Sequence, residues 1–246
     1  MPLGGPPLAL ELRGVSFGYR PGQPVLSDVD LAVAEGEFVA IAGPNGGGKT
    51  TLVRVALGLE RPAAGAVRLF GEPAHRFSRR SMLGYVAQRA QVGGHGPVTV
   101  REIVSAGRLA RSGVLGPLRA RDRAIVETAI DDVGLSELAD EPLSELSGGQ
   151  QQRAFIAKAF AGEPSLLILD EPTAGVDAGS QESLARLLDG LHRDRNVTTL
   201  YVSHEFGAVE GIVDRLVLVR GGIVFDGPPS TLPAEWHDPS HAHARL

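Results

Sequence analysis

The sequence GPNGGGKT, at residues 43–50, decides the fold of this chain, because it fits the pattern G-x-x-x-x-G-K-[ST] of a phosphate-binding loop. An apolar run at 37–42 (EFVAIA) precedes it and a helical pattern at 51–59 follows it, the strand-loop-helix context that such a loop needs. Glycines let successive backbone N–H groups turn toward phosphate oxygens, and the helix start adds a positive dipole. The motif predicts a nucleotide site formed by Gly43, Pro44, Asn45, Gly46, Gly47, Gly48, Lys49, Thr50 and Thr51.

Two side chains of this loop have separate expected roles. Lys49 is predicted to reach the β- and γ-phosphates, and the hydroxyl of Thr50 suits Mg²⁺. The alternative is a glycine-rich turn that fits the pattern by accident. Composition weakens that alternative, because Lys49 and Lys158 are the only lysines among the 24 basic residues.

The composition is typical of a soluble globular protein. The chain has 246 residues, a net charge of −5, 43% hydrophobic residues and no cysteine, which excludes disulfides and cysteine-based zinc sites. It has no apolar run of about 20 residues that could span a membrane, and residues 1–8 lack the regions of a secretory signal. Its mild acidity argues against a nucleic-acid-binding protein that relies on bulk positive charge. We therefore expect a cytosolic protein that binds no nucleic acid.

Short β-type runs alternate with helical patterns, which indicates an α/β domain with a largely parallel sheet. Core strands are predicted at 37–42, 165–169 and 198–202, and each ends in polar or glycine-rich residues. Ligands of open α/β sheets bind beyond the carboxyl ends of the strands, so we expect the chemistry there. A helix at 180–192 is predicted from one face of leucines at positions 184, 187, 188 and 191.

Four further segments have distinct patterns. Residues 8–33 alternate in β fashion around a turn and predict an added antiparallel layer. Residues 216–225 predict a hairpin that turns at 220–222. Residues 89–162 are mainly helical, as in an inserted subdomain, and the residues from 233 onward predict a poorly packed tail.

An acidic pair follows the second predicted strand. Asp170 and Glu171 come directly after SLLIL at 165–169. Asp170 is expected to hold Mg²⁺ through water, and Glu171 to orient or deprotonate the attacking water. Acidic residues after a strand are common, so this interpretation depends on the phosphate-binding loop.

The motif LSGGQQQR at 146–153 predicts an exposed helix start. Ser147, Gly148 and Gly149 form an N-cap and turn, with a helix following from about Gln150. Backbone N–H groups and a hydroxyl then point outward as a second anion-binding surface. The simpler alternative is an ordinary helix cap after a loop.

LSGGQQQR, with the phosphate-binding loop before it and LLILDEP after it, resembles the ABC-type ATPase family over about residues 8–228. The resemblance implies an α/β fold, with a P-loop ATPase core of mixed sheet, an N-terminal antiparallel β layer and an inserted helical subdomain. It implies a single ABC ATPase domain over 1–246, divided into a core at about 8–88 and 163–230, a helical subdomain at about 89–162 and a C-terminal tail at about 233–246.

The resemblance also assigns roles to single residues. Tyr19 resembles the aromatic that stacks on adenine, with packing on the core as the alternative. Gln88 resembles the glutamine that touches Mg²⁺ and the attacking water, and Asp177 ends a run that resembles the loop that crosses to a second subunit. His204 resembles the histidine that contacts the γ-phosphate, although a lone histidine after a strand is most often structural. The implied catalytic residues are Glu171, His204 and Gln88, and the implied Mg²⁺ ligands are Thr50, Gln88 and Asp170.

Members of this family pair head to tail. The resemblance therefore implies a homodimer in which each ATP, with Mg²⁺, lies between the phosphate-binding loop of one copy and Ser147, Gly148, Gly149 and Gln150 of the other. Hydrolysis then releases the dimer.

A single ATPase domain without a membrane segment resembles the separate ATPase subunit of a bacterial transporter. The implied partners are a polytopic membrane permease and an extracytoplasmic metal-binding protein, and the implied location is the cytoplasmic face of the cell membrane. DEPTAGVD at 170–177, PVTVREIV at 97–104 and AGR at 106–108 resemble ATPase subunits of zinc and manganese uptake systems. The implied function is ATP hydrolysis that energises transport of zinc or manganese.

The same motifs are compatible with other functions. Iron-chelate importers are close neighbours, and exporters share the catalytic residues, so the direction of transport belongs to the partner. A non-transport ABC ATPase of DNA repair or the ribosome is less favoured, because long heptad segments and a second ATPase domain are missing from this sequence. His237, His241 and His243 form either a metal-binding tail or a tail with chance histidines.

Overall fold

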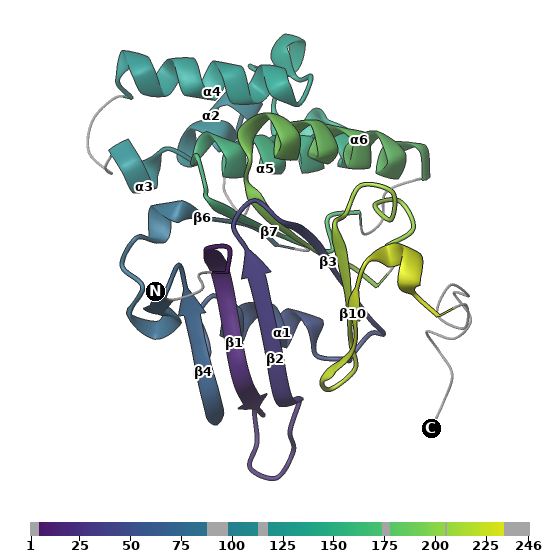
Figure 1. Ribbon diagram of the computed structural model, residues 1–246. Coiled ribbons are helices and arrows are strands. Elements are labelled where there is room, and N and C mark those ends of the chain that lie inside the picture. The colour runs from purple at the N-terminus through teal and green to yellow at the C-terminus, as the bar shows by residue number, and fades with distance from the viewer. Residues whose placement is uncertain (1–4, 88–97, 113–117, 174–177, 205, 234–246) are drawn as a thin grey trace. The chain divides into compact units, whose positions relative to one another are not determined.

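Two compact units make up the chain in the computed structural model (Figure 1). The first unit comprises 1–78 and 196–246, and the second comprises 79–195. The structure describes residues 5–87, 98–112, 118–173, 178–204 and 206–233. No helix among these residues is long and apolar enough to cross a membrane.

An antiparallel sheet forms one layer of the first unit. In it, β1 pairs with β2 on one side and with β4 on the other, and β5 pairs with β4. Buried residues alternate with exposed ones along β2, as expected of a strand with one covered face. The antiparallel pair predicted at 8–33 is confirmed as β1 and β2, but β4 and β5, which complete the layer, were not predicted. Its strands are β1 (Leu8–Phe17), β2 (Leu26–Ala34), β4 (Ala64–Leu69) and β5 (Glu72–Pro73).

A mixed sheet of the same unit carries the phosphate-binding loop. The strand β3 lies between β8 and β9 and runs parallel to both, whereas β10 is antiparallel to β9. All residues of β3 and β8 are buried, and β3 (FVAIA) is a continuous apolar run, whereas β8 begins with the two buried threonines Thr198 and Thr199. The predicted strand at 198–202 and the hairpin at 216–225 are confirmed. The elements are β3 (Phe38–Ala42), β8 (Thr198–Val202), β9 (Arg215–Val219) and β10 (Ile223–Gly227).

Two boundaries in this unit differ from the predicted ones. The strand β3 begins one residue late, because the Glu37 carboxylate accepts a hydrogen bond from the N–H of Ala34 and closes the preceding turn. The helix α1 (Lys49–Ala56) ends before the predicted residue 59. It ends there because Gly58 has a φ of +68°, which lets the N–H of Leu59 donate back to the Arg54 carbonyl. Short 3-10 turns, η1 (Ala74–Arg76) and η5 (Pro229–Thr231), follow β5 and β10.

The second unit combines a parallel strand pair with helices. Its strands β6 and β7 pair in register from Leu83 with Leu166 to Val86 with Leu169. The helices α2, α4 and α5 pack on one another through buried aliphatic side chains. The elements are η2 (Arg80–Met82), β6 (Leu83–Val86), α2 (Val100–Ala106), α3 (Leu109–Ser112), α4 (Ala120–Asp132), η3 (Ser136–Leu138), η4 (Leu143–Glu145), α5 (Gly148–Ala161), β7 (Leu166–Asp170) and α6 (Ala178–Arg195).

The helix predicted at 180–192 is confirmed and is longer at both ends. Leu184, Leu188 and Leu191 are buried along α6, and Leu187 is half-buried at the edge of the same face. Salt bridges of the last turn, including Arg193 with Asp189, extend the helix beyond its apolar stripe.

We expect Leu10→Ala to lower the free energy of unfolding by about 2–5 kcal/mol, because Leu10 is 1% exposed and its loss leaves a cavity behind β1. Val224→Ala is the control, since Val224 is 50% exposed on β10 and its truncation is expected to cost no more than about 0.5 kcal/mol. Chemical denaturation measures both. Equal losses for the two variants would contradict the placement of the core.

Candidate nucleotide-binding site

The phosphate-binding loop leaves the buried end of β3 and enters α1 directly. Lys49, the first residue of α1, is buried, and its Nζ donates to the carbonyl oxygens of Gly43 (2.8 Å) and Pro44 (3.2 Å). The N–H of Gly47 donates to the Pro44 carbonyl at 3.0 Å, which closes the loop. Gly48 caps α1 with a φ of +99° and no side-chain hydrogen bond. The first-turn N–H groups of a helix have no intrahelical partner, so this end suits an anion.

The hairpin between β9 and β10 supports the back of this loop. The N–H of Gly221 donates to the Gly47 carbonyl at 2.9 Å, and the N–H of Ser27 donates to the Gly221 carbonyl at 2.7 Å. A Cβ atom on Gly43 would overlap the Val219 carbonyl oxygen, and one on Gly47 would lie 2.8 Å from it. The loop therefore has no room for side chains on its inner side.

His204 lies at the same sheet edge as the loop. Since β3 and β8 are parallel and pair Ile41 with Val202, both strands deliver the residues after them to one edge. Ser203 is buried and its N–H donates to the Ile41 carbonyl at 3.0 Å, whereas His204 is exposed. The first unit thus places the phosphate-binding loop and His204 at the same edge of its sheet.

Tyr19 presents its ring to solvent. It is 58% exposed and contacts Phe17 edge to face, with ring centroids 4.9 Å apart. Phe17 is buried and fixes one edge of the Tyr19 ring. The alternative reading of Tyr19 as a core residue is therefore wrong.

The acidic pair lies at the end of β7 in the second unit. Asp170 and Glu171 are 2% and 5% exposed, and Tyr85 of β6 donates a hydrogen bond to Asp170 Oδ2 at 3.2 Å. Glu171 has a φ of +50°, in the left-handed region that residues other than glycine seldom adopt. Such strain is concentrated at functional sites, where the surrounding structure holds it in place.

Residues 147–150, here called the signature turn, form the start of α5. Ser147 is the N-cap: its Oγ accepts from the N–H of Gln150, whose side chain accepts from the N–H of Ser147. Ser147 and Gly148 are exposed. The helix begins at Gly148 rather than near the predicted Gln150, because this capping box draws both glycines into the first turn. A cavity of about 230 Å³ opens here, lined by Ser147, Gly149, Gln150, Gln152, Arg153, Ser180 and Leu184.

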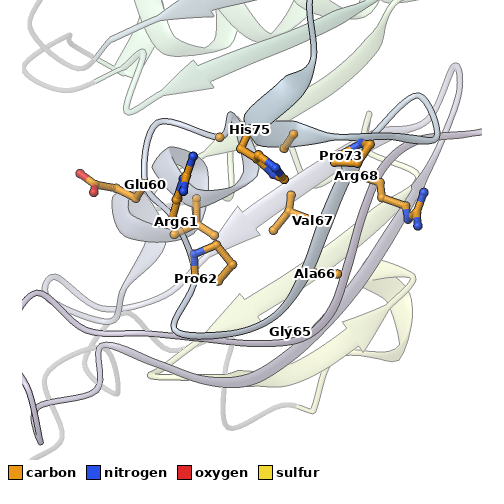
Figure 2. A pocket seen from close by; sticks show the side chains of 12 residues that line it. Glu60, Arg61, Pro62, Gly65, Ala66, Val67, Arg68, Pro73 and His75 are labelled. Carbon is orange, nitrogen blue, oxygen red and sulfur yellow. The ribbon is translucent and has the colours of Figure 1, made fainter.

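Another cavity, of about 380 Å³, lies between the end of α1 and the strands β4 and β5 (Figure 2). Figure 2 shows Glu60 and Arg61 on one side of it and Arg68 and Pro73 on the other. None of the described residues that line it belongs to the predicted nucleotide site. Gln88, Asp177 and the tail histidines His237, His241 and His243 lie outside the residues that the structure describes.

Comparison with known proteins identifies the family. A sequence model of the family described as ABC transporter matches residues 26–174. The chain belongs to the ABC transporter family. It is an ABC ATPase, the subunit type that hydrolyses ATP for a transporter.

Two curated relatives resemble this ABC ATPase over most of its length. The zinc uptake system ATP-binding protein ZurA of Listeria monocytogenes is 36% identical over 89% of this chain and 85% of its own. The manganese transport system ATP-binding protein MntB of Bacillus subtilis is 36% identical over 89% of this chain and 86% of its own.

Solved structures confirm the predicted fold of this ABC ATPase. One is cbiO1 from Clostridium perfringens, part of the ABC transporter complex cbiONQ, with a TM-score of 0.81 and 28% identity over 91% of this chain and 90% of that chain. Another is a dimeric ATP-binding cassette in a post-hydrolysis state bound to ADP and Pi, with a TM-score of 0.75 and 26% identity over 89% of this chain and 98% of that chain.

Sequence reasoning missed two contacts around the ABC ATPase site. The turn at 220–222 was predicted, but its hydrogen bond to the phosphate-binding loop was not, since no local pattern links positions so far apart. The bond of Tyr85 to Asp170 was also missed. No sequence signal points to it, because Tyr85 is 41% exposed and its hydroxyl could equally be satisfied by water.

We expect Gly43→Ala to weaken ATP binding about tenfold or more, because its Cβ would displace the loop from Val219. Gly46→Ala should have a smaller effect, since its Cβ meets open space and only its φ of +79° is unfavourable, by about 1–2 kcal/mol. Titration with a fluorescent ATP analogue measures both affinities. An unchanged affinity for Gly43→Ala would rule out the close support of the loop.

Proposed function

We propose that this ABC ATPase hydrolyses ATP at sites shared between two copies of itself and thereby energises uptake of zinc or manganese through a separate membrane permease. ATP hydrolysis at a shared site is supported by one observation. The chain has two helix starts that suit an anion, at α1 and α5, and they lie in different units. One nucleotide needs the start of α1 on one side and the start of α5 on the other. In a head-to-tail pair, each nucleotide site takes α1 from one copy and α5 from the other. Within this proposal 1–246 form one ATPase domain, with about 89–162 as its helical subdomain.

The nucleotide is held through its phosphates and its base. Residues 43–51 surround the β- and γ-phosphates, with the Lys49 ammonium moving from the loop carbonyls to phosphate oxygens. Tyr19 stacks its exposed ring on adenine. The signature turn of the second copy, with Ser147, Gly148, Gly149 and Gln150, donates to the γ-phosphate, and Asp177 lies at the subunit contact.

The donor chemistry fits Mg²⁺. Thr50 is exposed at the start of α1 and Asp170 is a buried carboxylate, and a hydroxyl, a carboxylate and the amide oxygen of Gln88 are the hard oxygen ligands that this ion prefers. Asp170 already accepts from Tyr85, which fixes the orientation of its carboxylate. When bound with ATP, Mg²⁺ neutralises charge on the β- and γ-phosphates.

Three side chains act on the water that attacks the γ-phosphate. Glu171 orients this water and accepts its proton, and its αL backbone and burial hold the carboxylate in one direction. His204 donates to the γ-phosphate from the sheet edge that carries the loop. Gln88 contacts the water and links the nucleotide site to the helical subdomain.

The transport part rests on the relatives, which are named for zinc uptake and manganese transport. A permease in the membrane is the partner that the ATPase drives, and an extracytoplasmic metal-binding protein supplies the ion. The ATPase then works at the cytoplasmic face of the membrane. Zinc or manganese is the cargo of this system.

We expect Glu171→Gln to trap an ATP-bound dimer with little turnover, because the amide keeps the shape of the carboxylate but accepts no proton. Gel filtration with and without ATP, beside a phosphate-release assay, measures both effects. Glu137→Gln, at an exposed glutamate in η3, is the control and should turn over ATP normally. A Glu171→Gln protein that elutes as a monomer with saturating ATP would refute the shared site.

We expect the genes beside this one to encode a polytopic membrane protein and a metal-binding lipoprotein or secreted protein. Deletion of the ATPase gene should then abolish growth in medium depleted of zinc or manganese and stop uptake of the radioactive ion. Lys49→Ala on a plasmid should fail to restore uptake, whereas the unmodified gene should restore it. Neighbouring genes for a peptide or sugar permease, or rescue only by an iron chelate, would overturn the assignment of the cargo.

A further inference from the structure

An ionic cluster centred on a buried arginine lies at the end of α5 that is remote from the signature turn. Arg108 follows α2 and is 4% exposed. Its Nε and Nη2 lie 2.9 and 2.8 Å from Asp122 Oδ1, and its Nη1 donates to the Ala161 carbonyl at 2.8 Å and to Glu163 Oε2 at 2.8 Å. One guanidinium therefore joins the end of α2, the first turn of α4 and the last turn of α5.

The chemistry of this cluster needs an arginine. A buried cation is tolerated when its charge is paired and its N–H groups are used, and the planar fork of Arg108 reaches three acceptors at once. The cation lies at the C-terminus of α5 and its partner Asp122 at the N-terminus of α4, so both complement the helix dipoles. The hydrogen bond from Arg108 holds the pKa of Glu163 below its ordinary value.

Arg111 and Gly107 also contact the C-terminal end of α5. Arg111 donates from Nε to the Gly162 carbonyl and from Nη2 to the Glu163 carbonyl, both at 2.7 Å. A Cβ on Gly107 would overlap the Lys158 carbonyl oxygen, so the backbone after α2 lies directly against α5. The last carbonyls of α5, which have no intrahelical partner, are thus bound by side chains of the α2–α3 corner.

The other end of α5 is the signature turn. A helix of 14 residues is a rod of about 21 Å, and α5 buries Ile156, Ala157 and Phe160 along its length. Because α5 is packed along one side and held at its C-terminal end by Arg108 and Arg111, it can neither slide nor rotate unless these two side chains move with it. The position of the exposed Ser147 and Gly148 therefore depends on the bonds made at Ala161–Glu163.

We propose that Arg108 is a positioning residue for ATP hydrolysis: by binding the C-terminal carbonyls of α5 it places the signature turn against the nucleotide held by the partner copy. This inference rests on the proposed shared site. It also gives a physical role to AGR at 106–108, in which Gly107 allows the close approach and Arg108 makes the bonds. Misplacement of a positioned group by about 1 Å costs on the order of a hundredfold in rate.

The first experiment compares Arg108→Gln with Arg101→Gln. Arg101 is a matched control, since it leaves the same helix α2, but its side chain is 35% exposed and forms its ion pairs with Asp140 and Glu127 rather than with α5. We expect Arg108→Gln to lower kcat about tenfold or more and to leave the ATP affinity of the monomer unchanged, because the phosphate-binding loop is in the other unit. Arg108→Lys, which keeps the charge, should recover part of kcat. Arg101→Gln should retain kcat.

The second experiment separates positioning from stability. Arg108→Met combined with Asp122→Leu replaces the ion pair by apolar side chains of similar size, which often restores stability. We expect its thermal midpoint to return toward the wild-type value while kcat stays low, because methionine cannot hold the Ala161 carbonyl. Recovery of kcat together with the midpoint would reduce Arg108 to a structural residue and overturn the proposal.

The last measurement tells this inference apart from the proposed function. In the Glu171→Gln background, ATP should drive dimerisation, and adding Arg108→Gln should raise the ATP concentration needed by about tenfold or abolish the dimer. Equal dimerisation of both proteins overturns the positioning role alone. If Glu171→Gln by itself stays monomeric with ATP, the shared site fails and the inference fails with it.

Discussion

The structure of this ABC ATPase depends on the contact between the phosphate-binding loop and the backbone of the β9–β10 hairpin. The loop must curl tightly enough to aim its N–H groups at one point, and it is supported from behind by the carbonyl of Val219 and the N–H of Gly221. Only glycine fits at Gly43, because the support is the backbone of β9, a strand that is paired on both sides in the mixed sheet and cannot move aside. The mixed sheet is therefore a rigid base for one anion site, and α1 begins where that base ends.

In the second unit, side chains hold the start of α5 in place. Its signature turn has a capping box at one end of α5, and the charge clamp of Arg108 and Arg111 holds the other end. A buried guanidinium costs desolvation, and the hydrogen bonds that Arg108 makes to Asp122 of α4, to Ala161 of α5 and to Glu163 offset that cost. Two helix starts, one supported by a sheet and one by a clamp, give this ATPase two surfaces of the same chemistry. In the proposed shared site, one nucleotide uses both surfaces through a second copy of the chain.

Much of the fold was predictable because its signals are local. The strand at 198–202 (TTLYV) consists of β-branched, aliphatic and aromatic residues and was found with correct limits. The alternation at 8–33 predicted β1 and β2, whereas β4 and β5 of the same layer were not predicted. Helix limits were less accurate. Gly58 stops α1 early through a left-handed turn, and the capping box of Ser147 starts α5 at Gly148, because hydrogen bonds at the ends outweigh the apolar pattern.

The sequence alone determined which residues form the phosphate-binding loop, the acidic pair and the signature turn, since each is a short motif whose chemistry follows from neighbouring residues. The tertiary structure decided what holds those motifs in place. Tyr85 reaches Asp170 across a strand pair, Gly221 reaches Gly47 from a distant hairpin, and Arg108 reaches Ala161 from the turn between α2 and α3. These contacts join positions tens to more than a hundred residues apart. No local period or spacing encodes them, because they arise only when packing brings separate elements within hydrogen-bond distance.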